Sequence, residues 1–520
     1  MKQSKLWNLL FAVLWLLQLV AEVITLMTIQ RLDMLPDQYV ILLVAFFLAL
    51  WAIMGLMLFM RSKSGRSGLR QGTACFLVLA IVLGCAGVTT VAADVYETLH
   101  AVVQQPSTEN KLTRTVYVRA DDPAQTLFDA AGYTFAIVEN YDTVYTQLAV
   151  EKIQQILGKE IEIHSYATVA GMVDGLYAGE VNAIILNSAY VSLLQDDQNY
   201  ADFDTKTRVL CELELQEQVV TPTIDPTDPN PDNPKPSRPS EPTLPPIVKP
   251  EDITTQSFVV YVGGSDARSS YLTTSNSDVN ILAVVNPETK QILLVNTPRD
   301  YYIANPAGGG ALDKLTHCGI YGVENSMKAL SELYDIRVDY YAQVNFAGFE
   351  TMIDAIGGIT VKSNVAFTTR DGAYYFHEGD NYMDGAKALA FARERSAFAA
   401  GDVARGQNQM KVIKAVIQKL TSGSTILSRY SEILESMKGM FKTNLGTGEM
   451  GQLVKMQLTD LASWNIMSVS VSGYGDSRYT YSMPGEWLYV MQPDYDRVAQ
   501  VEELIDRVVA GEILTDADLK

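Results

Sequence analysis

The sequence predicts a mixed α/β protein: a mixed central sheet flanked by helices, a smaller α/β domain, and three N-terminal transmembrane helices. Three observations lead to this prediction. Three apolar runs of membrane-spanning length lie within residues 1–94. Downstream, short apolar runs typical of buried strands alternate with segments of helical periodicity. A proline-rich stretch separates two such regions, so the 520 residues are expected to form more than one folded domain.

Residues 1–94 are predicted to be a membrane anchor with transmembrane helices at about 6–27, 39–60 and 73–93. Each run is long enough to cross ~30 Å of hydrocarbon at ~1.5 Å per residue. The last two contain no charged side chain, whereas the first contains Gln18 and Glu22. A cleaved signal peptide is the alternative for the first run. The run is longer than a typical signal-peptide core, and two more spans follow, so a transmembrane helix is favoured.

Basic residues on one side of the spans predict the orientation in the membrane. Six of them precede the first span or lie between the second and third: Lys2, Lys5, Arg61, Lys63, Arg66 and Arg70. Cytoplasmic loops carry an excess of lysine and arginine. We therefore expect a multi-pass protein of the cell membrane, with its N-terminus in the cytoplasm and everything after the third span outside.

The charge of the exterior region excludes one large class of partner. The chain has a net charge of −20, and residues 1–72 carry seven basic and three acidic residues, a net of +4, which leaves −24 for the remainder. Nucleic-acid binding depends on a basic surface that neutralises phosphates. We therefore expect no nucleic-acid partner. The cysteines show no disulfide framework or metal spacing, although a single bridge between Cys211 and Cys318 is an alternative.

Residues 95–218 are predicted to form an extracellular α/β accessory domain. Strand-like and helix-like runs alternate in it: Thr134–Val138, Tyr141–Leu157, Ile161–Ile163, Val169–Tyr177 and Asn182–Leu186. This order implies a small sheet covered by helices. The pattern resembles one lobe of a periplasmic-type solute-binding domain. It contains no catalytic constellation, so a packing or partner-binding role is expected.

Residues 219–252 are predicted to be a linker. Eleven of the 19 prolines of the chain fall within residues 221–250, and apolar periodicity is missing there. Such a stretch buries too little apolar surface to offset the entropy lost on ordering. We expect an extended, semi-rigid spacer.

Residues 253–513 are predicted to form the larger α/β domain. Its expected strands are Phe258–Val262, Val279–Val285, Gln291–Val295 and Tyr340–Val344. Its expected helices are Ser326–Leu333, Gly348–Ile356, Asp384–Phe391 and Gln407–Leu420. The second of these should end at the Gly357-Gly358 pair, and the third begins at an aspartate suited to an N-cap.

Charged residues recur where these strands begin and end. Asp266 and Arg268 follow the first strand, Asp278 precedes the second, and Arg299-Asp300 follows the third. Loops at the carboxyl ends of strands are where α/β folds place their ligands. If the first two strands are antiparallel neighbours, these groups share one edge of the sheet.

Five arginines in an acidic region predict a site for a multiply charged anion: Arg268, Arg299, Arg393, Arg395 and Arg405. Guanidinium groups pair with phosphate oxygens two at a time. Arg393 and Arg395 share a face if their segment is extended, and Glu394 then faces away. Asp266 and Asp278 beside a phosphate site suggest Mg²⁺, which usually takes one or two carboxylates plus phosphate oxygens.

Taken in order, the motifs identify the chain as a member of the LytR–CpsA–Psr family of cell-envelope proteins, over about residues 256–500. They are Gly-Ser-Asp-Ala-Arg (264–268), Ser-Asp (277–278), Thr-Pro-Arg-Asp (297–300), Asp-Lys-Leu-Thr-His (313–317), Ile-Gly-Gly-Ile-Thr-Val (356–361), the run from Asp384 to Arg395, and Gly401 to Arg405 with Gln409.

This resemblance implies the corresponding catalytic domain and a phosphotransferase that moves glycan-phosphate from a polyprenyl-pyrophosphate carrier to peptidoglycan. It implies Mg²⁺ on Asp266 and Asp278. The pyrophosphate would lie among Arg268, Arg299, Arg393, Arg395 and Arg405, with Gln409 nearby. Two departures concern substrate affinity or acceptor choice: Asn276 and Asn408 stand where the family often has arginine.

The catalytic roles are less fully defined by the sequence. Arg299 is expected to stabilise charge on the departing phosphate. Asp300 and Asp402 are candidate bases, or else orienting partners for neighbouring arginines. Phe349, Met352, Ile353, Ile356 and Phe391, with the strand at 340–344, are expected to be core, with a lipid tunnel as the alternative.

Two side-chain sets outside the main motifs have alternative interpretations. His317 is expected to be structural rather than a base. Tyr474, Tyr479 and Tyr481 are expected on a partly exposed strand, with stacking on sugar rings as the alternative.

The sequence therefore predicts a membrane-anchored, Mg²⁺-dependent glycopolymer transferase of cell-wall assembly. Its expected partners are the polyprenyl-pyrophosphate-linked glycan, the peptidoglycan acceptor and the cytoplasmic membrane. Two alternatives remain: a pyrophosphatase acting on the same lipid-linked substrate, and a non-catalytic envelope receptor or attenuator that binds lipid-linked glycan.

Overall fold

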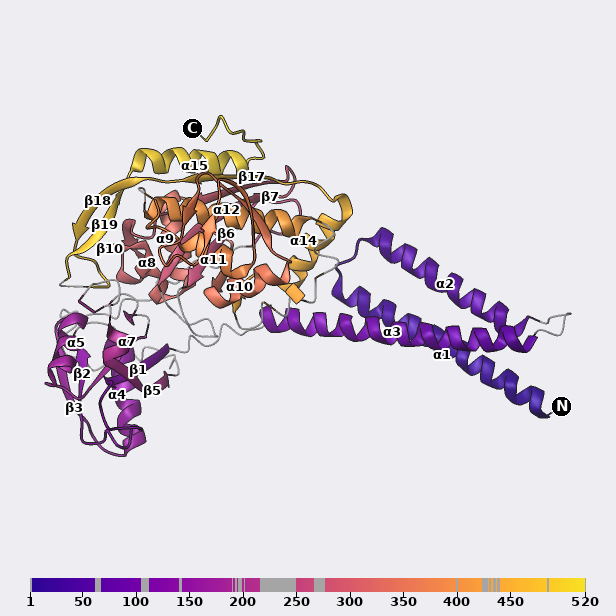
Figure 1. Ribbon diagram of the computed structural model, residues 1–520, viewed down its shortest axis with the longest axis horizontal. Coiled ribbons are helices and arrows are strands. Elements are labelled where there is room, and N and C mark those ends of the chain that lie inside the picture. The colour runs from indigo at the N-terminus through magenta and orange to yellow at the C-terminus, as the bar shows by residue number, and fades with distance from the viewer. Residues whose placement is uncertain are drawn as a thin grey trace, which may run out of the picture.

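The computed structural model describes most of the chain. The described residues are 2–60, 67–103, 112–139, 143–188, 190–191, 194, 199–200, 202–215, 249–265, 276–398, 401–422, 429, 432–433, 436, 440–483 and 486–519. They form an arm of three helices, a small α/β body (residues 112–215) and a large α/β body (residues 249–519) (Figure 1). The predicted linker lies almost entirely outside the described residues.

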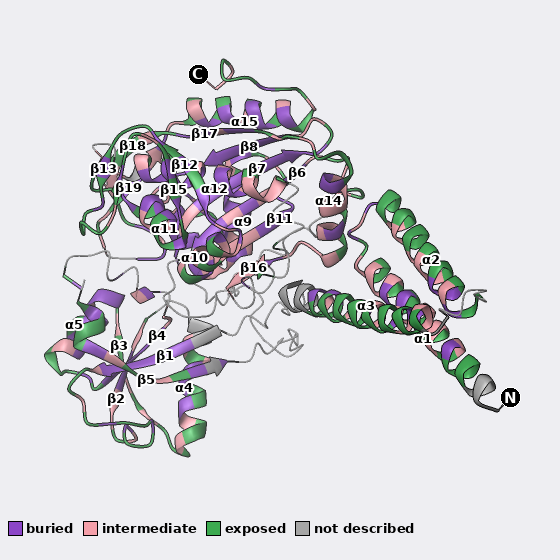
Figure 2. Ribbon diagram, turned by 45° about the vertical axis from the view of Figure 1, so that its right-hand side comes forward, coloured by how far each residue is buried: buried purple, intermediate pink, exposed green. Residues whose placement is uncertain are grey.

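The arm consists of α1 (Lys2–Leu32), α2 (Asp37–Phe59) and α3 (Ser67–Val103). Each contains a stretch long and apolar enough to cross a membrane: Trp7–Leu32, Asp37–Phe59 and Leu69–Glu97. Much of their surface is exposed although it is apolar, as Figure 2 shows. Apolar side chains avoid water unless another apolar phase covers them. These helices therefore indicate a membrane protein, as predicted.

The arm and the large body meet at helix α14 (Thr447–Asp460). Lys455 Nζ lies 3.3 Å from Oδ1 of Asp33, in the turn after α1, and 3.0 Å from Oδ1 of Asp37, the first residue of α2. Beside this ion pair, Met34 and Val95 of the arm form an apolar cluster with partly buried side chains of α14. The large body thus contacts the arm near the turn between α1 and α2.

The large body is built on a mixed six-stranded sheet, as predicted. In spatial order its strands are β16 (Phe441–Thr443), β11 (Tyr340–Asn345), β6 (Phe258–Ser265), β7 (Ser277–Asn286), β8 (Gln291–Asn296) and β17 (Asn465–Ser470). β6, β7 and β8 form an antiparallel meander, while β11 pairs parallel with β6 and β17 pairs parallel with β8. The meander therefore places the end of β6, the start of β7 and the end of β8 at one edge.

Helices cover both faces of this sheet. They are α8 (Leu315–Cys318), α9 (Val323–Tyr334), α10 (Phe346–Ala355), α11 (Gly385–Arg393), α12 (Asp402–Thr421), α14 and α15 (Tyr495–Val509). Side chains of β7 alternate between two apolar clusters. Leu282 and Val284 pack with α9 and α15, whereas Ile281 and Ala283 pack with Met410 of α12. Alternation of period two is what a strand buried on both faces requires.

Smaller elements complete the large body. They are β9 (Tyr302–Asn305), η1 (Pro306–Gly308), β10 (Ala311–Lys314), η2 (Gly319–Tyr321), β12 (Ile359–Ser363), β13 (Phe367–Thr368), β14 (Tyr375–Phe376), β15 (Gly379–Met383), β18 (Gly473–Arg478) and β19 (Leu488–Pro493). Asp384 caps α11 by accepting a hydrogen bond from the Lys387 backbone N–H at 3.0 Å, as expected. Ile353, Ile356 and Phe391 are buried in a cluster with β12 and α12, which agrees with the core interpretation.

The small body is a five-stranded sheet in the order β3 (Glu162–Tyr166), β2 (Thr134–Val138), β4 (Ala183–Leu186), β1 (Leu112–Arg119) and β5 (Thr207–Leu215). Its helices are α4 (Thr143–Leu157), α5 (Val169–Ala178) and α7 (Phe203–Lys206). The sequence did not predict β1 and β5. The apolar runs in these strands are only three residues long, at 116–118 in β1 and 209–211 in β5, and polar or charged side chains flank them.

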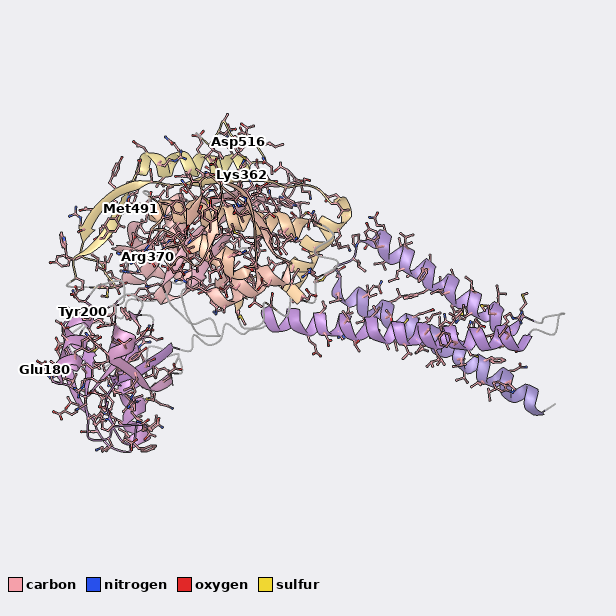
Figure 3. All side chains as sticks on the ribbon, viewed as in Figure 1. Glu180, Tyr200, Lys362, Arg370, Met491 and Asp516 are labelled. Carbon is pink, nitrogen blue, oxygen red and sulfur yellow. The ribbon has the colours of Figure 1, made fainter. Side chains whose placement is uncertain are left out.

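The two bodies share an apolar contact. Ile320 and Met483 of the large body are buried in the same cluster as Tyr190, Tyr200 and Phe203 of the small body. Tyr200, labelled in Figure 3, lies on the side of the small body that faces the large body. Both exterior cysteines are free thiols, and no bridge joins them. The contact between the bodies is therefore made by side-chain packing.

Candidate functional site

Two strands of the large body place Asp278 beside Arg299. β7 and β8 are antiparallel, with Ile281 opposite Asn296. Residues that precede Ile281 therefore lie next to residues that follow Asn296. Arg299 Nη1 lies 2.9 Å from Asp278 Oδ1. The structure thus brings these two predicted site residues together, with Asp278 inside β7 rather than just before it.

Helix α12 brings Arg405 and Gln409 to the same place. It begins at Asp402, five residues before the predicted start, so Arg405 lies in its first turn. Gly406 allows the helix to approach β8, because a Cβ atom there would lie 2.5 Å from Asn296 Nδ2. The positive end of the helix dipole consequently points toward the site, which favours bound anions.

These elements line a small hollow that is partly open to solvent. Its lining comes from β7, β17, α12 and the end of β8: Asp278, Asn296, Thr297, Pro298, Arg299, Val403, Arg405, Gly406, Gln409, Ser470 and Val471. Only three of these side chains are charged, and two of the three are arginines. The hollow is therefore suited to an anionic group.

The arginines control the charge of Asp278. Burial by itself raises the pKa of this carboxyl, but the guanidinium groups of Arg299, Arg405 and Arg393 outweigh burial and hold the pKa below its usual range. Arg393 is placed by Phe346, whose ring centroid lies 4.4 Å from the guanidinium carbon. Asp278 is therefore an ionised carboxylate at neutral pH, surrounded by cations.

Lys314 and Asp300 extend this network. Lys314 Nζ lies 3.1 Å from Asp300 Oδ1, and Arg299 Nε lies 3.8 Å from Asp300 Oδ2. Each carboxylate oxygen of Asp300 thus faces a cation. This arrangement favours Asp300 as an orienting partner of Arg299 over Asp300 as a base. The sequence analysis did not identify Lys314 as a site residue, although Lys314 belongs to the Asp-Lys-Leu-Thr-His motif of the family resemblance.

Other predicted site residues are placed differently or lie outside the described residues. Asp266 and Arg268 belong to the latter group, as does the side chain of Asp402. Arg393 and Arg395 are both exposed, and neither lines the hollow. Glu394, which stands between Arg393 and Arg395 in the sequence, is buried. Its carboxylate accepts hydrogen bonds from the backbone N–H groups of Arg370 and Ala397, at 2.8 and 2.9 Å.

Two asparagines and a histidine complete the predicted set. Asn276 and Asn408 are both buried. In the sequence, Asn276 lies two residues before Asp278, and Asn408 directly precedes Gln409. His317 is buried, and its Nδ1 lies 2.6 Å from Asp313 Oδ1. Asp313 also accepts a hydrogen bond from Asn305 at 3.0 Å. The environment of His317 therefore agrees with the structural role expected for it.

The residues present are compatible with a magnesium ion. The described residues contain no group of three or more His, Cys, Asp or Glu side chains arranged for a metal. Mg²⁺ does not require such a group, because it usually takes one or two carboxylates and completes its shell with water and phosphate oxygens. The ionised carboxylate of Asp278 is a suitable donor at the anion hollow.

Comparison with known proteins agrees with this architecture. A sequence model of the LytR_cpsA_psr family matches residues 233–502. The chain belongs to the LytR–CpsA–Psr family. It is 32% identical over 240 residues to the polyisoprenyl-teichoic acid–peptidoglycan teichoic acid transferase TagU of Oceanobacillus iheyensis, covering 44% of this chain and 70% of that protein. It is 35% identical over 237 residues to the transferase TagT of Bacillus subtilis, covering 44% and 71%.

Solved structures of such proteins match about half of the chain. A structure of TagT bound to LI-WTA has 27% identity and a TM-score of 0.40, and covers 51% of this chain and 94% of that one. The crystal structure of TagV from B. subtilis has 23% identity and a TM-score of 0.42, and covers 50% and 99%. The family match begins at residue 233, so the small α/β body (residues 112–215) lies outside it.

Proposed function

We propose that this protein transfers a glycan-phosphate from a polyprenyl-pyrophosphate carrier to peptidoglycan on the outer side of the membrane. The observation that carries the proposal is the position of Arg299 and Arg405 beside Asp278 in the lining of the hollow, with Arg299 Nη1 2.9 Å from Asp278 Oδ1. The relatives, which are named as teichoic acid transferases, support the same reaction class.

The residues of the hollow are suited to phosphoryl transfer. A sugar hydroxyl of the wall would attack the glycan-side phosphorus of the pyrophosphate, forming a new P–O bond. The bond to the bridging oxygen breaks, and the lipid monophosphate leaves with that oxygen. Such reactions depend mainly on positioning and on neutralising charge. Arg299 and Arg405 would bind the phosphate oxygens and stabilise the charge that develops on the leaving phosphate.

The remaining residues position these arginines and the substrate. The Lys314–Asp300 pair would hold the guanidinium of Arg299 in place. Gln409, one turn after Arg405, would donate a hydrogen bond to the substrate. Asp402 at the start of α12 is our candidate for the group that accepts the proton of the attacking hydroxyl. Arg268 and Arg395 would contact the pyrophosphate from the rim.

We also propose that Asp278 and Asp266 hold a magnesium ion when substrate is bound. Mg²⁺ would supply further neutralisation of the pyrophosphate charge. The proposed topology places the N-terminus in the cytoplasm and the large body outside. A lipid-linked substrate in the outer leaflet then lies on the side of the membrane that carries the hollow.

The test is Asp278→Ala in the purified full chain in detergent micelles. With lipid-linked donor, peptidoglycan acceptor and Mg²⁺, release of lipid monophosphate should fall by roughly 10³-fold or more. Asp460→Ala is the matched control, since Asp460 pairs with Lys290 at 3.0 Å on the surface of the same body. Undiminished turnover by Asp278→Ala would exclude the assigned role.

The same assay separates the two alternatives. A pyrophosphatase would release lipid monophosphate at the same rate without the peptidoglycan acceptor, leaving phosphate on the free glycan. A receptor would bind the lipid-linked donor and give no turnover in the native chain. The transferase requires release that depends on the acceptor.

A further inference from the structure

The hairpin of β18 and β19 carries three aromatic side chains in a row. The two strands are antiparallel, with Ser477 opposite Tyr489 and Arg478 opposite Leu488. Tyr479 and Trp487 are the next residues beyond the Arg478–Leu488 pair, and the same register continued by one step places them opposite each other. Their ring centroids lie 4.9 Å apart at an interplanar angle of 76°. This edge-to-face contact fixes both rings relative to each other.

The third ring lies on the same face of the hairpin. In an antiparallel ladder, facing pairs that are two residues apart project from the same face of the sheet. Tyr489 therefore lies on the same face as Tyr479 and Trp487. Gly475 leaves space for the Tyr489 ring, since a Cβ atom there would lie 3.1 Å from Tyr489 Cε2. Tyr479, Trp487 and Tyr489 form what we call the aromatic row.

The aromatic row is open to solvent. Its residues are 57%, 59% and 51% exposed, in the order Tyr479, Trp487 and Tyr489. The small body packs against Met483 and the partly buried Leu488 of the same hairpin, yet it leaves the row uncovered. Adjacent exposed aromatics are unfavourable in water and typical of binding surfaces.

The row is continuous with the candidate active site. Ser470 and Val471, at the end of β17, line the hollow, and β18 begins at Gly473. On the other strand, the Met491 backbone N–H donates a hydrogen bond to the Asp300 carbonyl at 2.7 Å. Met491, labelled in Figure 3, lies on the hairpin side of the large body. From Met491 to Trp487 the strand covers about 14 Å at ~3.4 Å per residue.

The chemistry of this face is suited to sugar rings. The other residues facing the same way in the paired strands are all uncharged: Gly473, Gly475, Ser477, Pro493 and the buried Met491. Asp476 and Arg478 face the opposite way. The negative faces of aromatic rings attract the polarised C–H groups of a pyranose. A phosphate-rich polymer would instead require cations along its path.

We propose that the aromatic row binds the glycan strand of peptidoglycan and directs its hydroxyl toward the hollow. This inference rests on the proposed function, because it assigns the acceptor to a particular surface of the transferase. The donor pyrophosphate lies at the arginines, and the acceptor strand approaches along the hairpin from Trp487 past Tyr489 toward Asp300.

The test uses full-length protein in detergent micelles and soluble peptidoglycan glycan strands as the probe. Trp487→Ala and Tyr489→Ala should each weaken strand binding, measured by calorimetry, and raise the KM for the acceptor by about tenfold. kcat at saturating acceptor and binding of the lipid-linked donor should stay as in the native chain. Trp487→Phe should restore most of the affinity, which also shows that the hairpin remains folded.

Tyr474→Ala is the matched control, since Tyr474 is 68% exposed on the opposite face of the same hairpin. It should bind glycan strands like the native chain. The inference is wrong if Tyr474→Ala weakens strand binding as much as Trp487→Ala does. It is also wrong if the variants of the aromatic row bind glycan strands like the native chain, or if they lose affinity for the donor and not for the acceptor. If the native chain shows no turnover, the proposed function is wrong. Titration of the native chain and its variants with glycan strands would still test whether the aromatic row binds them.

Discussion

The two α/β bodies both contain an arginine–aspartate pair, but the pairs differ in burial and in origin. In the large body, Arg299 and Asp278 lie 2.9 Å apart with side chains that are 12% and 19% exposed. In the small body, Arg119 and Asp121 lie 3.3 Å apart and are 37% and 83% exposed. The first pair is brought together by two strands, whereas the second joins neighbours in one turn.

This difference is the reason why we propose chemistry at the pair in the large body and none at the pair in the small body. Exposed pairs are screened by water and contribute little. Charges in a partly closed hollow interact strongly, because less water competes with them. The antiparallel meander of the large body therefore matters more than its arginine content. It places charges from distant segments at one edge of the sheet.

Arg299→Ala should produce the largest effect. The variant removes the cation that contacts both Asp278 and Asp300, and with it the proposed stabilisation of the leaving phosphate. We expect release of lipid monophosphate to fall by roughly 10³-fold, measured with saturating donor and acceptor. Arg119→Ala is the matched control in the small body and should leave turnover unchanged.

Arg299→Lys sharpens this comparison. Lysine retains the charge but not the two-pronged geometry of the guanidinium. Turnover should therefore recover only in part. Full recovery would mean that charge alone matters at this position, and a loss with Arg119→Ala would show that the small body contributes to the reaction.

Lys314→Met should produce an intermediate effect. Lys314 and Asp300 are 3.1 Å apart and only 12% and 13% exposed, and the variant leaves Asp300 with Arg299 alone. We expect turnover to fall by about tenfold to a hundredfold, because Arg299 loses its fixed position. Lys206→Met is the matched control: its pair with Asp202, at 2.9 Å, is about half exposed in both side chains. Equal effects of the two variants would contradict the role of burial.

The sequence allowed much of this arrangement to be predicted. Continuous apolar runs identified β6, β7 and β8, and the charged residues at their ends indicated the shared edge. Strands β1 and β5 were missed because their apolar runs, at 116–118 and 209–211, are only three residues long and polar residues flank them. The early start of α12 was missed because Asp402, Arg405 and Gly406 break the apolar pattern there. Lys314 was missed as a site residue because its role depends on Asp300, fourteen positions away.

The smallest effect on turnover is expected from Met483→Ala, at the contact between the bodies. Met483 is buried with Ile320 against the small body, so its truncation should loosen that contact. We expect faster proteolysis of the small body, with turnover within about twofold of the native chain because the hollow is untouched. Met327→Ala, with a similar loss of volume beneath the large sheet, should instead destabilise the large body by about 2–4 kcal/mol. A loss of turnover with Met483→Ala as large as that with Lys314→Met would show that the docked small body is part of the catalytic apparatus.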